Sequence, residues 1–344
     1  MNLETLLNTI RANASTTYQE RIPEATRDNL ESIRYAMIDD NNIMVANEFM
    51  STLLNKLVKS VVHTKMFSNP LKGLKKGTKP LGDTIEEIYN NFLKGVQYEG
   101  KTAGQTLLER NLPDTKTVYH RMNYQLQYPV TVSREQLSKA FASYNALESY
   151  ITGIINSLYN SAELDEFANM KQLLKSALDK GALKKVTVED PTQSDAKGKK
   201  FIKEVKTVSD LMTFPSDQFN SYLAVQESDT KPIVTFSRKS EQILIIDTAT
   251  NVSLNVDVLA SLFNMSVAEF NDTKKIVIDT FPDANVRACL VDEAFFQIYD
   301  DLFTITSFYN GQGLYTNYYL NVWQTQAYSV LVNGVAFTTE VIGG

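Results

Sequence analysis

The chain has 344 residues, of which 43% are hydrophobic, so it is long enough for about two domains with a substantial core. Its 34 basic and 40 acidic residues give a net charge of −6, which argues against a protein that holds nucleic acid over a wide basic face. A single cysteine, Cys289, excludes an intramolecular disulfide, and no apolar run is long enough to span a membrane.

The N-terminal part is predicted to combine an irregular arm with helices. Residues 1–24 are polar, and we interpret them as an arm that becomes ordered only against a partner. Apolar residues at helical spacing predict helices over residues 26–37 and 42–62. A loop rich in lysine, glycine and proline is predicted to follow, over residues 70–82.

A long strand is the clearest element in the sequence. Residues 117–130 alternate between apolar and polar side chains, and only His120 interrupts the apolar face. This period of two predicts a strand with one buried face, and its length favours a projecting hairpin over part of a compact sheet. The spacing in residues 83–94 fits a helix, but only over a short length.

Two helix-start signals follow this strand. Ser133 with Gln136 forms a capping box that predicts a short helix, and Asn145 with Glu148 repeats the pattern. The second helix is predicted to continue until Gly181 ends it. At 1.5 Å per residue, its roughly 34 residues would span about 51 Å.

The C-terminal half is predicted to hold a second α/β region, at about residues 203–300, after a polar loop over residues 190–200. The expected elements of this region are a helix over residues 255–265 and β-rich runs at residues 233–236, 243–247 and 275–279. Further strands are predicted from there to the end of the chain.

Residues suited to catalysis are scarce. The two histidines, His63 and His120, lack a zinc-binding spacing, and Cys289 lies in an apolar run that favours a buried thiol. In the lysine-rich loop the Lys follows the Thr, and Pro80 removes a backbone donor, so the pattern of a phosphate-binding loop is not met. Adjacent carboxylates point apart and are interpreted as solvated surface. We therefore expect no enzyme, no cofactor and no bound metal.

Six segments, in order, resemble a known protein family. They read NPLKGLKKGTKPLGDTIEEIY, KTVYHRMN, IINSLYNSAELDEFANMK, LNVDVLASLFNM, CLVDEAFFQIYDDL and GLYTNYYLNVWQT. From about residue 65 to the end, the chain resembles the major capsid proteins of phi29-like short-tailed phages. The resemblance implies an α+β chain with the Hong Kong 97-type major capsid fold.

The resemblance also implies a division of the chain. The expected parts are an N-terminal arm with helices (1–63), an extended hairpin called the E-loop (64–131), a P-domain (132–202) with a long spine helix (145–180), an A-domain (203–300), and C-terminal strands that return to the P-domain (301–344). For residues 83–94 it favours an extended conformation over a helix. Some relatives carry a C-terminal immunoglobulin-like domain, which we do not expect here because the sequence stops at VIGG.

The implied function is that of a major capsid protein that assembles with itself into pentamers and hexamers. These would form an icosahedral or prolate shell, the virion capsid, around packaged double-stranded DNA. The expected partners are identical subunits, a scaffolding protein and the portal, with assembly in the host cytoplasm. Because the net charge is −6, we expect only weak contact with DNA, and we expect no membrane partner.

Contacts between subunits are expected to involve the lysine-rich segment. We expect lysines of one subunit to meet acidic residues of the spine helix on its neighbour: Lys72, Lys75, Lys76 and Lys79 against Glu163, Asp165 and Glu166. Exposed pairs contribute only ~0.2–1 kcal/mol each, so they would set register more than strength. The simpler interpretation is a solvated basic loop. For the whole chain, the alternatives are an α/β hydrolase-type or transferase enzyme and another phage structural component, such as a tail or portal protein.

Overall fold

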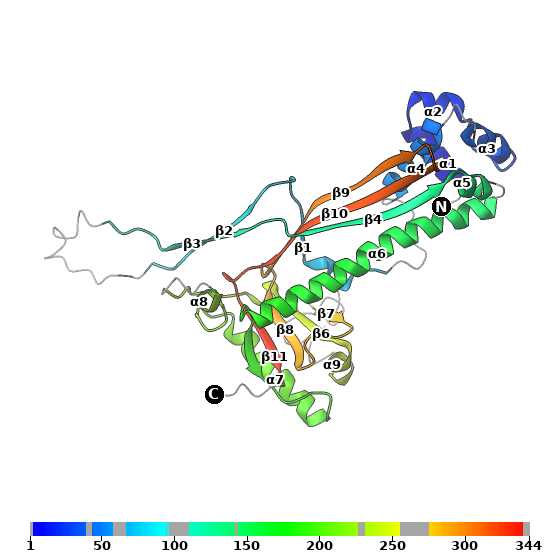
Figure 1. The fold of residues 1–344 in the computed structure, drawn as a ribbon. Helices are drawn as coiled ribbons and strands as arrows, with labels where there is room; N and C mark the ends of the chain where they lie inside the picture. Colours follow the sequence, from blue (N-terminus) through cyan, green and yellow to red (C-terminus); the bar gives the residue numbers. More distant parts are fainter. Residues whose placement is uncertain are drawn as a thin grey trace. The chain divides into compact units, whose positions relative to one another are not determined.

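The computed structural model describes residues 3–38, 43–57, 67–93, 95, 110–141, 144–225, 231–254 and 275–339. The chain forms two compact units. Figure 1 shows the helices and strands of both. Unit 1 comprises Met1–Asn69, Asn123–Phe167 and Asp300–Gln324. Unit 2 comprises Pro70–Met122, Ala168–Tyr299 and Thr325–Gly344.

Four helices open unit 1: α1 (Leu3–Asn13), α2 (Thr16–Arg21), α3 (Leu30–Ile38) and α4 (Ile43–Leu57). Ile10 of α1 and Tyr18 of α2 are buried in the same core as Phe49 of α4. The Asn8 side chain ties α1 to Ala25 through two hydrogen bonds, of 3.1 and 2.7 Å. The prediction of an irregular arm over residues 1–24 is therefore wrong, because these helices bury their apolar side chains within the chain itself.

The main sheet of unit 1 is antiparallel where β4 (Tyr124–Ser133) pairs with β10 (Tyr315–Tyr328), in a register from Tyr315↔Ser133 to Gln324↔Tyr124. In the strand order β1-β9-β10-β4, β9 (Phe296–Asn310) lies next to β10, and β1 (Lys75–Thr78) is a strand of unit 2. Exposed and covered residues alternate along β4, as its sequence predicts. This sheet supplies much of the core of unit 1, with Leu320 and Val322 buried in it.

The strand predicted over residues 117–130 is in fact two strands. β3 (Thr115–His120) belongs to unit 2, and β4 belongs to unit 1, with residues 121–123 between them. Each strand has a different partner, β2 for the first and β10 for the second. The alternation keeps its phase across the break, so the period alone does not reveal that the chain changes partners.

Two helices follow β4. Ser133 and Gln136 form the predicted capping box at the start of α5 (Arg134–Ala140). The long predicted helix is α6 (Tyr144–Asp179), whose 36 residues span roughly 54 Å at the usual rise. Gly181 follows it with φ of 71°, the left-handed conformation that commonly ends a helix. Because α6 begins at Tyr144, Asn145 lies inside the helix and not at the predicted cap.

Unit 2 contains a five-stranded sheet in the order β5-β11-β8-β6-β7. The strands are β5 (Lys184–Thr187), β6 (Gln242–Asp247), β7 (Lys275–Ile278), β8 (Val286–Asp292) and β11 (Gly334–Thr338). Leu244, Leu290 and Val335 are fully buried in its core together with Phe201 of α7 (Asp195–Leu211). The predicted strands at 243–247 and 275–279 are confirmed as β6 and β7. Cys289 of β8 is buried, which raises the pKa of its thiol to about 12.

Several predictions for the second half of the chain need correction. The loop predicted over residues 190–200 ends at Ser194, whose side chain caps α7, so the rest is helical. Residues 233–236 are not a strand, because only Thr235 forms an isolated bridge, with Ser216. The helix predicted over residues 255–265 lies outside the described residues. Unit 2 also contains two short helices, α8 (Tyr222–Val225) and α9 (Thr248–Ser253), and a 3-10 turn at Lys239–Glu241.

The C-terminal segment 301–344 is divided between the two sheets. Most of β9 and β10 belongs to unit 1, where β10 lies between β9 and β4, whereas β11 pairs with β5 and β8 in the sheet of unit 2. Among the helices within the described ranges, none has both the length and the apolar character needed to cross a bilayer.

Candidate assembly interface

An isolated two-stranded sheet is the most unusual surface feature of unit 2. β2 (Ile85–Asn90) and β3 pair antiparallel from Ile85↔His120 to Asn90↔Thr115 and form a sheet of their own, which we call the ribbon. The extended conformation favoured for residues 83–94 is thus confirmed over β2. Residues 94 and 96–109, which would connect the two strands, lie outside the described residues.

One face of the ribbon packs on the rest of unit 2. The Tyr89 hydroxyl donates a hydrogen bond to the backbone oxygen of Val234, and burial raises the pKa of that hydroxyl. The Lys116 ammonium lies 5.6 Å from the centre of the Tyr222 ring, a cation–π contact. His120, which interrupts the apolar pattern, is buried on this face, with Nε2 2.7 Å from Glu87 Oε2. His120 is therefore a paired, buried residue of the ribbon.

The other face of the ribbon is uncovered and partly apolar. Ile88 is 60% exposed and Tyr119 is 61% exposed, and the cross-strand partner of Ile88 is the exposed Thr117. The Tyr119 hydroxyl donates to Glu86 Oε1 at 3.0 Å, which holds the ring across the ribbon and raises the pKa of the hydroxyl. Full burial of a fully exposed apolar side chain contributes roughly 1.5–3 kcal/mol, and Ile88 still has 60% of its surface to bury, so this face is suited to protein contact.

Exposed apolar residues continue beyond the paired strands. Phe92 and Leu93 follow β2, and Leu112 precedes β3; they are 54%, 77% and 81% exposed. The Phe92 ring stacks on Phe236, with centroids 6.4 Å apart. The sequence reasoning missed these residues and the exposed face of the ribbon. The available signal was that Ile88, Phe92 and Leu93 lie close together in the sequence.

The lysine-rich segment is more ordered than predicted. A 3-10 helix covers Pro70–Leu74 and strand β1 covers Lys75–Thr78, so the loop prediction for residues 70–82 holds only for its last part. Lys76 Nζ donates to the backbone oxygen of Glu293 at 2.5 Å, and Lys79 Nζ donates to that of Asp83. Since β1 is followed by another strand and not by a helix, the segment lacks the geometry of a phosphate-binding loop.

The three predicted acidic residues lie in the part of α6 that belongs to unit 1. Glu163 accepts a hydrogen bond from the Asn69 backbone amide at 3.2 Å, and exposed Asp165 accepts one from the Tyr128 hydroxyl at 3.0 Å. Glu166 is buried and accepts from Asn69 Nδ2 at 3.2 Å and Gln324 Nε2 at 2.7 Å. Glu163 and Asp165 are therefore the better placed of the three for a partner, since Glu166 is enclosed in unit 1.

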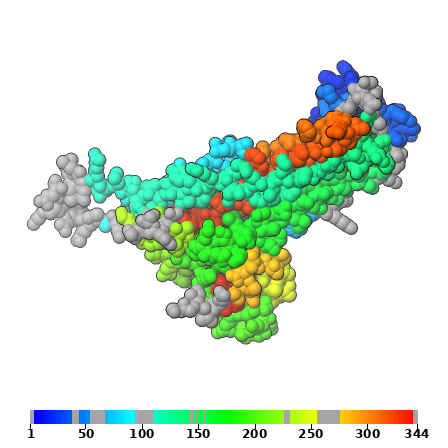
Figure 2. Space-filling view, viewed as in Figure 1, coloured from blue at the N-terminus to red at the C-terminus, as the bar shows by residue number. Residues whose placement is uncertain are grey.

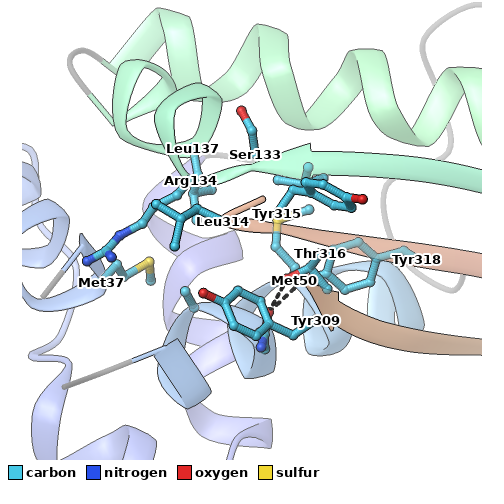
Figure 3. Close-up of a pocket in the computed structure, with 13 residues that line it drawn as sticks. Met37, Met50, Ser133, Arg134, Leu137, Tyr309, Leu314, Tyr315, Thr316 and Tyr318 are labelled. Atoms are coloured by element: carbon cyan, nitrogen blue, oxygen red, sulfur yellow. Dashed lines mark hydrogen bonds between the residues drawn. The ribbon is translucent and has the colours of Figure 1, made fainter. Parts of the chain in front are cut away.

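A small pocket lies within unit 1, between the N-terminal helices and the turn that joins β9 to β10 (Figure 3). Met37, Met50 and Leu137 line it, and Asn47 Oδ1 accepts hydrogen bonds from Thr316 and Tyr318 at 2.7 and 3.4 Å. Its volume of about 40 Å³ is enough for one or a few water molecules and too small for a nucleotide or sugar.

Metal-binding and nucleophilic groups offer no competing site among the described residues. Within those ranges, no three His, Cys, Asp or Glu side chains are grouped so as to hold a metal ion. The Cys289 thiol is buried with a raised pKa, which makes it a poor nucleophile. His63 lies outside the described residues.

Comparison with solved structures shows the fold. The capsid structure of Staphylococcus phage Andhra superposes with a TM-score of 0.66 at 13% identity, over 82% of this chain and 87% of that chain. The mature capsid of bacteriophage PhiM1 gives a TM-score of 0.51 at 11% identity, over 81% of this chain and 89% of that chain. The α+β chain thus has the Hong Kong 97-type capsid fold, as its resemblance implies.

Sequence comparison shows the family. The major capsid protein of Bacillus phage PZA is 35% identical over 97% of this chain and 72% of its own length, and that of Bacillus phage B103 matches equally well. The major capsid protein of Streptococcus phage Cp-1 is 29% identical over 80% of this chain and 75% of its own length. A sequence model of the phi29-like phage major capsid proteins matches residues 7–338. The chain belongs to the family of phi29-like phage major capsid proteins.

Proposed function

We propose that this chain builds the virion shell by burying the ribbon of each subunit on a neighbouring copy. The observation that carries the proposal is the uncovered face of the ribbon, where Ile88 and Tyr119 are more than half exposed. A two-stranded sheet is only marginally stable in water without further packing, and unit 2 covers one face of the ribbon while the face with Ile88 and Tyr119 stays exposed. A contact with another copy supplies both a cover for these side chains and a reason for identical subunits to associate.

The copies are proposed to form rings of five and six in an icosahedral or prolate shell around double-stranded DNA. Rings require a head-to-tail contact between two different surfaces, because only such a contact closes by rotation. Individually weak contacts, summed over a shell, allow misplaced subunits to leave and still give a durable assembly. Assembly in the host cytoplasm with a scaffolding protein and a portal, and the absence of enzymatic activity, belong to the same proposal.

The parts of the capsid fold are assigned accordingly. We place the ribbon in the E-loop (64–131), α6 in the spine helix (145–180) of the P-domain (132–202), and β6, β7 and β8 in the A-domain (203–300). The N-terminal segment (1–63) contributes helices α1 to α4, and β9 and β10 accompany the P-domain strand β4. The last strand, β11, is assigned to the A-domain sheet because it pairs with β5 and β8.

The lysine-rich segment is proposed to fix the register between neighbours. Lys72 and Lys76 are exposed, and Lys75 and Lys79 are half-buried. Their proposed partners on the adjacent subunit are Glu163 and Asp165. Replacing all four lysines with Glu should lower the yield of regular shells at low salt, and added salt should narrow the difference from the unmodified chain.

The matched control for this experiment replaces four other exposed lysines with Glu: Lys180, Lys199, Lys203 and Lys206. Both variants change the net charge equally, and thermal unfolding of each free subunit separates a loss of assembly from a loss of the fold, because Lys75 and Lys79 are half-buried. Normal shells from the variant at Lys72, Lys75, Lys76 and Lys79 would rule out this part of the proposal.

Weak contact with DNA is proposed because the net charge of −6 disfavours tight binding, and packaged DNA must slide during filling. The free subunit should therefore show no strong salt-dependent binding to a DNA duplex in a filter-binding or anisotropy assay. Tight binding with a steep salt dependence would contradict this.

Negative-stain electron microscopy of the purified, concentrated protein, with and without its scaffolding partner, tests the proposed function as a whole. Closed shells are expected. Tubes or isolated rings would favour another phage structural role, and a small, uniform oligomer would favour the enzyme alternative.

A further inference from the structure

The sheet in unit 1 has two outer edges, and they differ in chemistry. β4 is the last strand on one side and carries Pro129 near its middle. Proline has no backbone N–H, and native sheets place it on edges, where it discourages pairing with another chain. Arg134 and α5 follow β4 directly, so this edge ends in a capped helix. The β4 edge is therefore protected.

The β9 edge lacks such protection. β9 has 15 residues, and the only described strand beyond it is β1, with 4 residues, so most of β9 has no described strand on that side (Figure 1). Residues 302–310 read LFTITSFYN, without charge or proline and rich in β-branched and aromatic residues. Phe303 and Phe308 are 48% and 67% exposed, and β9 (orange) reaches the surface in Figure 2.

A long, uncharged and open edge is a template for one more strand. The ribbon can supply this strand. Each of its two strands has a single described partner, the other ribbon strand, so each has an outer edge available for pairing. Pairing a ribbon strand with β9 would give three or more continuous strands, the arrangement that is stable where two strands alone are marginal. β9 also presents no charge over residues 302–310 that would repel Glu86 or Lys116 of the ribbon.

We propose that residues 303–310 of β9 accept an edge strand of the ribbon of a second copy, so that a β-sheet continues from subunit to subunit. This inference rests on the proposed function and names the acceptor surface for the ribbon. Pairing of β9 with a second β9 would use the same surface twice and stop at two copies. Pairing of β9 with the ribbon uses two different surfaces, so each copy both gives and receives a strand, as a closed ring requires.

Engineered cysteines test the pairing directly, because the one native thiol is buried and has a raised pKa. Thr306→Cys marks the β9 edge, and Ile88→Cys and Thr117→Cys mark the two ribbon strands; all three positions are exposed. A disulfide-linked dimer is expected when the Thr306→Cys protein is mixed with a ribbon variant, assembled and oxidised. Gln125→Cys on the protected β4 edge is the matched control and should give none.

Two results would overturn the inference. A disulfide-linked dimer from Thr306→Cys alone would show that β9 pairs with itself. Shells in which no cysteine placed along β9, at Phe303, Thr306 or Phe308, forms a disulfide with either ribbon variant would show that the ribbon docks elsewhere.

A charge placed on the edge provides a second test. Thr306→Lys should keep the folded subunit, checked by its thermal unfolding, and should lower the shell yield at least about tenfold. Gln125→Lys should assemble normally. If the unmodified chain forms no shells, the proposed function fails; if it forms shells and Thr306→Lys forms them equally well, only the assignment of β9 fails.

Discussion

The ribbon and the five-stranded sheet of unit 2 are built from similar residues, but they bury them to different extents. In the sheet, β8 and β11 bury Leu290, Val335 and Ala336 completely, and each strand has partners on both sides. In the ribbon, β2 and β3 have only each other among the described strands and leave Ile88 and Tyr119 exposed. Both regions favour strands by composition. The difference indicates that the sheet stabilises the subunit, whereas the ribbon becomes stable through contacts that another subunit supplies.

The largest effect on subunit stability is expected from the sheet. Leu290→Ala removes a fully buried side chain packed with Leu244 and Val335, and should lower the free energy of unfolding by about 2–5 kcal/mol. Chemical denaturation of the free subunit measures this. A loss under about 1 kcal/mol would show that the sheet does not stabilise the subunit, and would contradict the proposed difference between the sheet and the ribbon.

A smaller loss is expected from Gly334→Ala at the start of β11. A Cβ there would lie 2.7 Å from Phe295 Cε2 and 3.0 Å from Leu183 Cδ2, closer than carbon atoms pack. Overpacking of this kind costs roughly 1–3 kcal/mol. Gly73→Ala is the matched control, because a Cβ at Gly73 meets nothing within 4 Å. Equal denaturation midpoints for the two variants would contradict the close packing of β11.

The ion pair between Arg287 of β8 and Asp190 should contribute less, about 1–2 kcal/mol, with a characteristic pH dependence. The two side chains meet at 2.9 Å. Burial raises the pKa of Asp190, but hydrogen bonds from Arg287 and Thr192 outweigh it and lower the pKa from 3.8 to about 2. A lowered folded-state pKa stabilises the fold above the unfolded value, so this contribution is present above pH ~4 and is lost as the pH falls toward ~2.

Asp190→Asn tests this pair through denaturation curves at several pH values. The variant should be less stable than the unmodified chain near pH 7, and the difference should shrink as the pH falls below 4. A difference that stays constant from pH 7 to pH 2 would show that the carboxylate charge is not the cause.

The smallest effect on the free subunit is expected from the ribbon. Ile88→Ala shortens an exposed side chain and should change the free energy of unfolding by less than about 0.5 kcal/mol. Shell yield, measured by sedimentation, should nevertheless fall, because the same side chain is proposed to be buried between subunits. If Ile88→Ala lowered the free energy of unfolding as much as Leu290→Ala does, the ribbon would belong to the subunit core.

Local patterns predicted the strands and helices well where one element had one environment. The alternation in β4, the capping box at Ser133 and the length of α6 are all readable from residue spacing. The break between β3 and β4 could not be predicted from residue spacing, because the alternation is continuous and only the partner strands change. The helices of residues 1–24 could have been found, since Leu6, Leu7 and Ile10 have helical spacing and Glu4 and Arg11 suit the ends of α1.

The candidate interface was less accessible to sequence reasoning. Charges drew attention to the lysine-rich segment, while the exposed positions of Ile88 and Tyr119 depend on which face of the ribbon unit 2 covers. That in turn depends on contacts distant in sequence, such as the hydrogen bond from Tyr89 to Val234. Burial of Glu166 by Asn69 and Gln324 is equally non-local. The protein family, in contrast, was readable from six segments because they occur in order.

Hydrogen exchange of the ribbon amides, followed by mass spectrometry in the free subunit and in the assembled shell, tests the central claim most directly. Residues 85–90 and 115–120 should exchange quickly in the free subunit and slowly in the shell, while β8 and β11 should be protected in both. Ribbon amides that are equally protected in both states, or equally unprotected, would contradict the proposal that a neighbouring copy completes the ribbon.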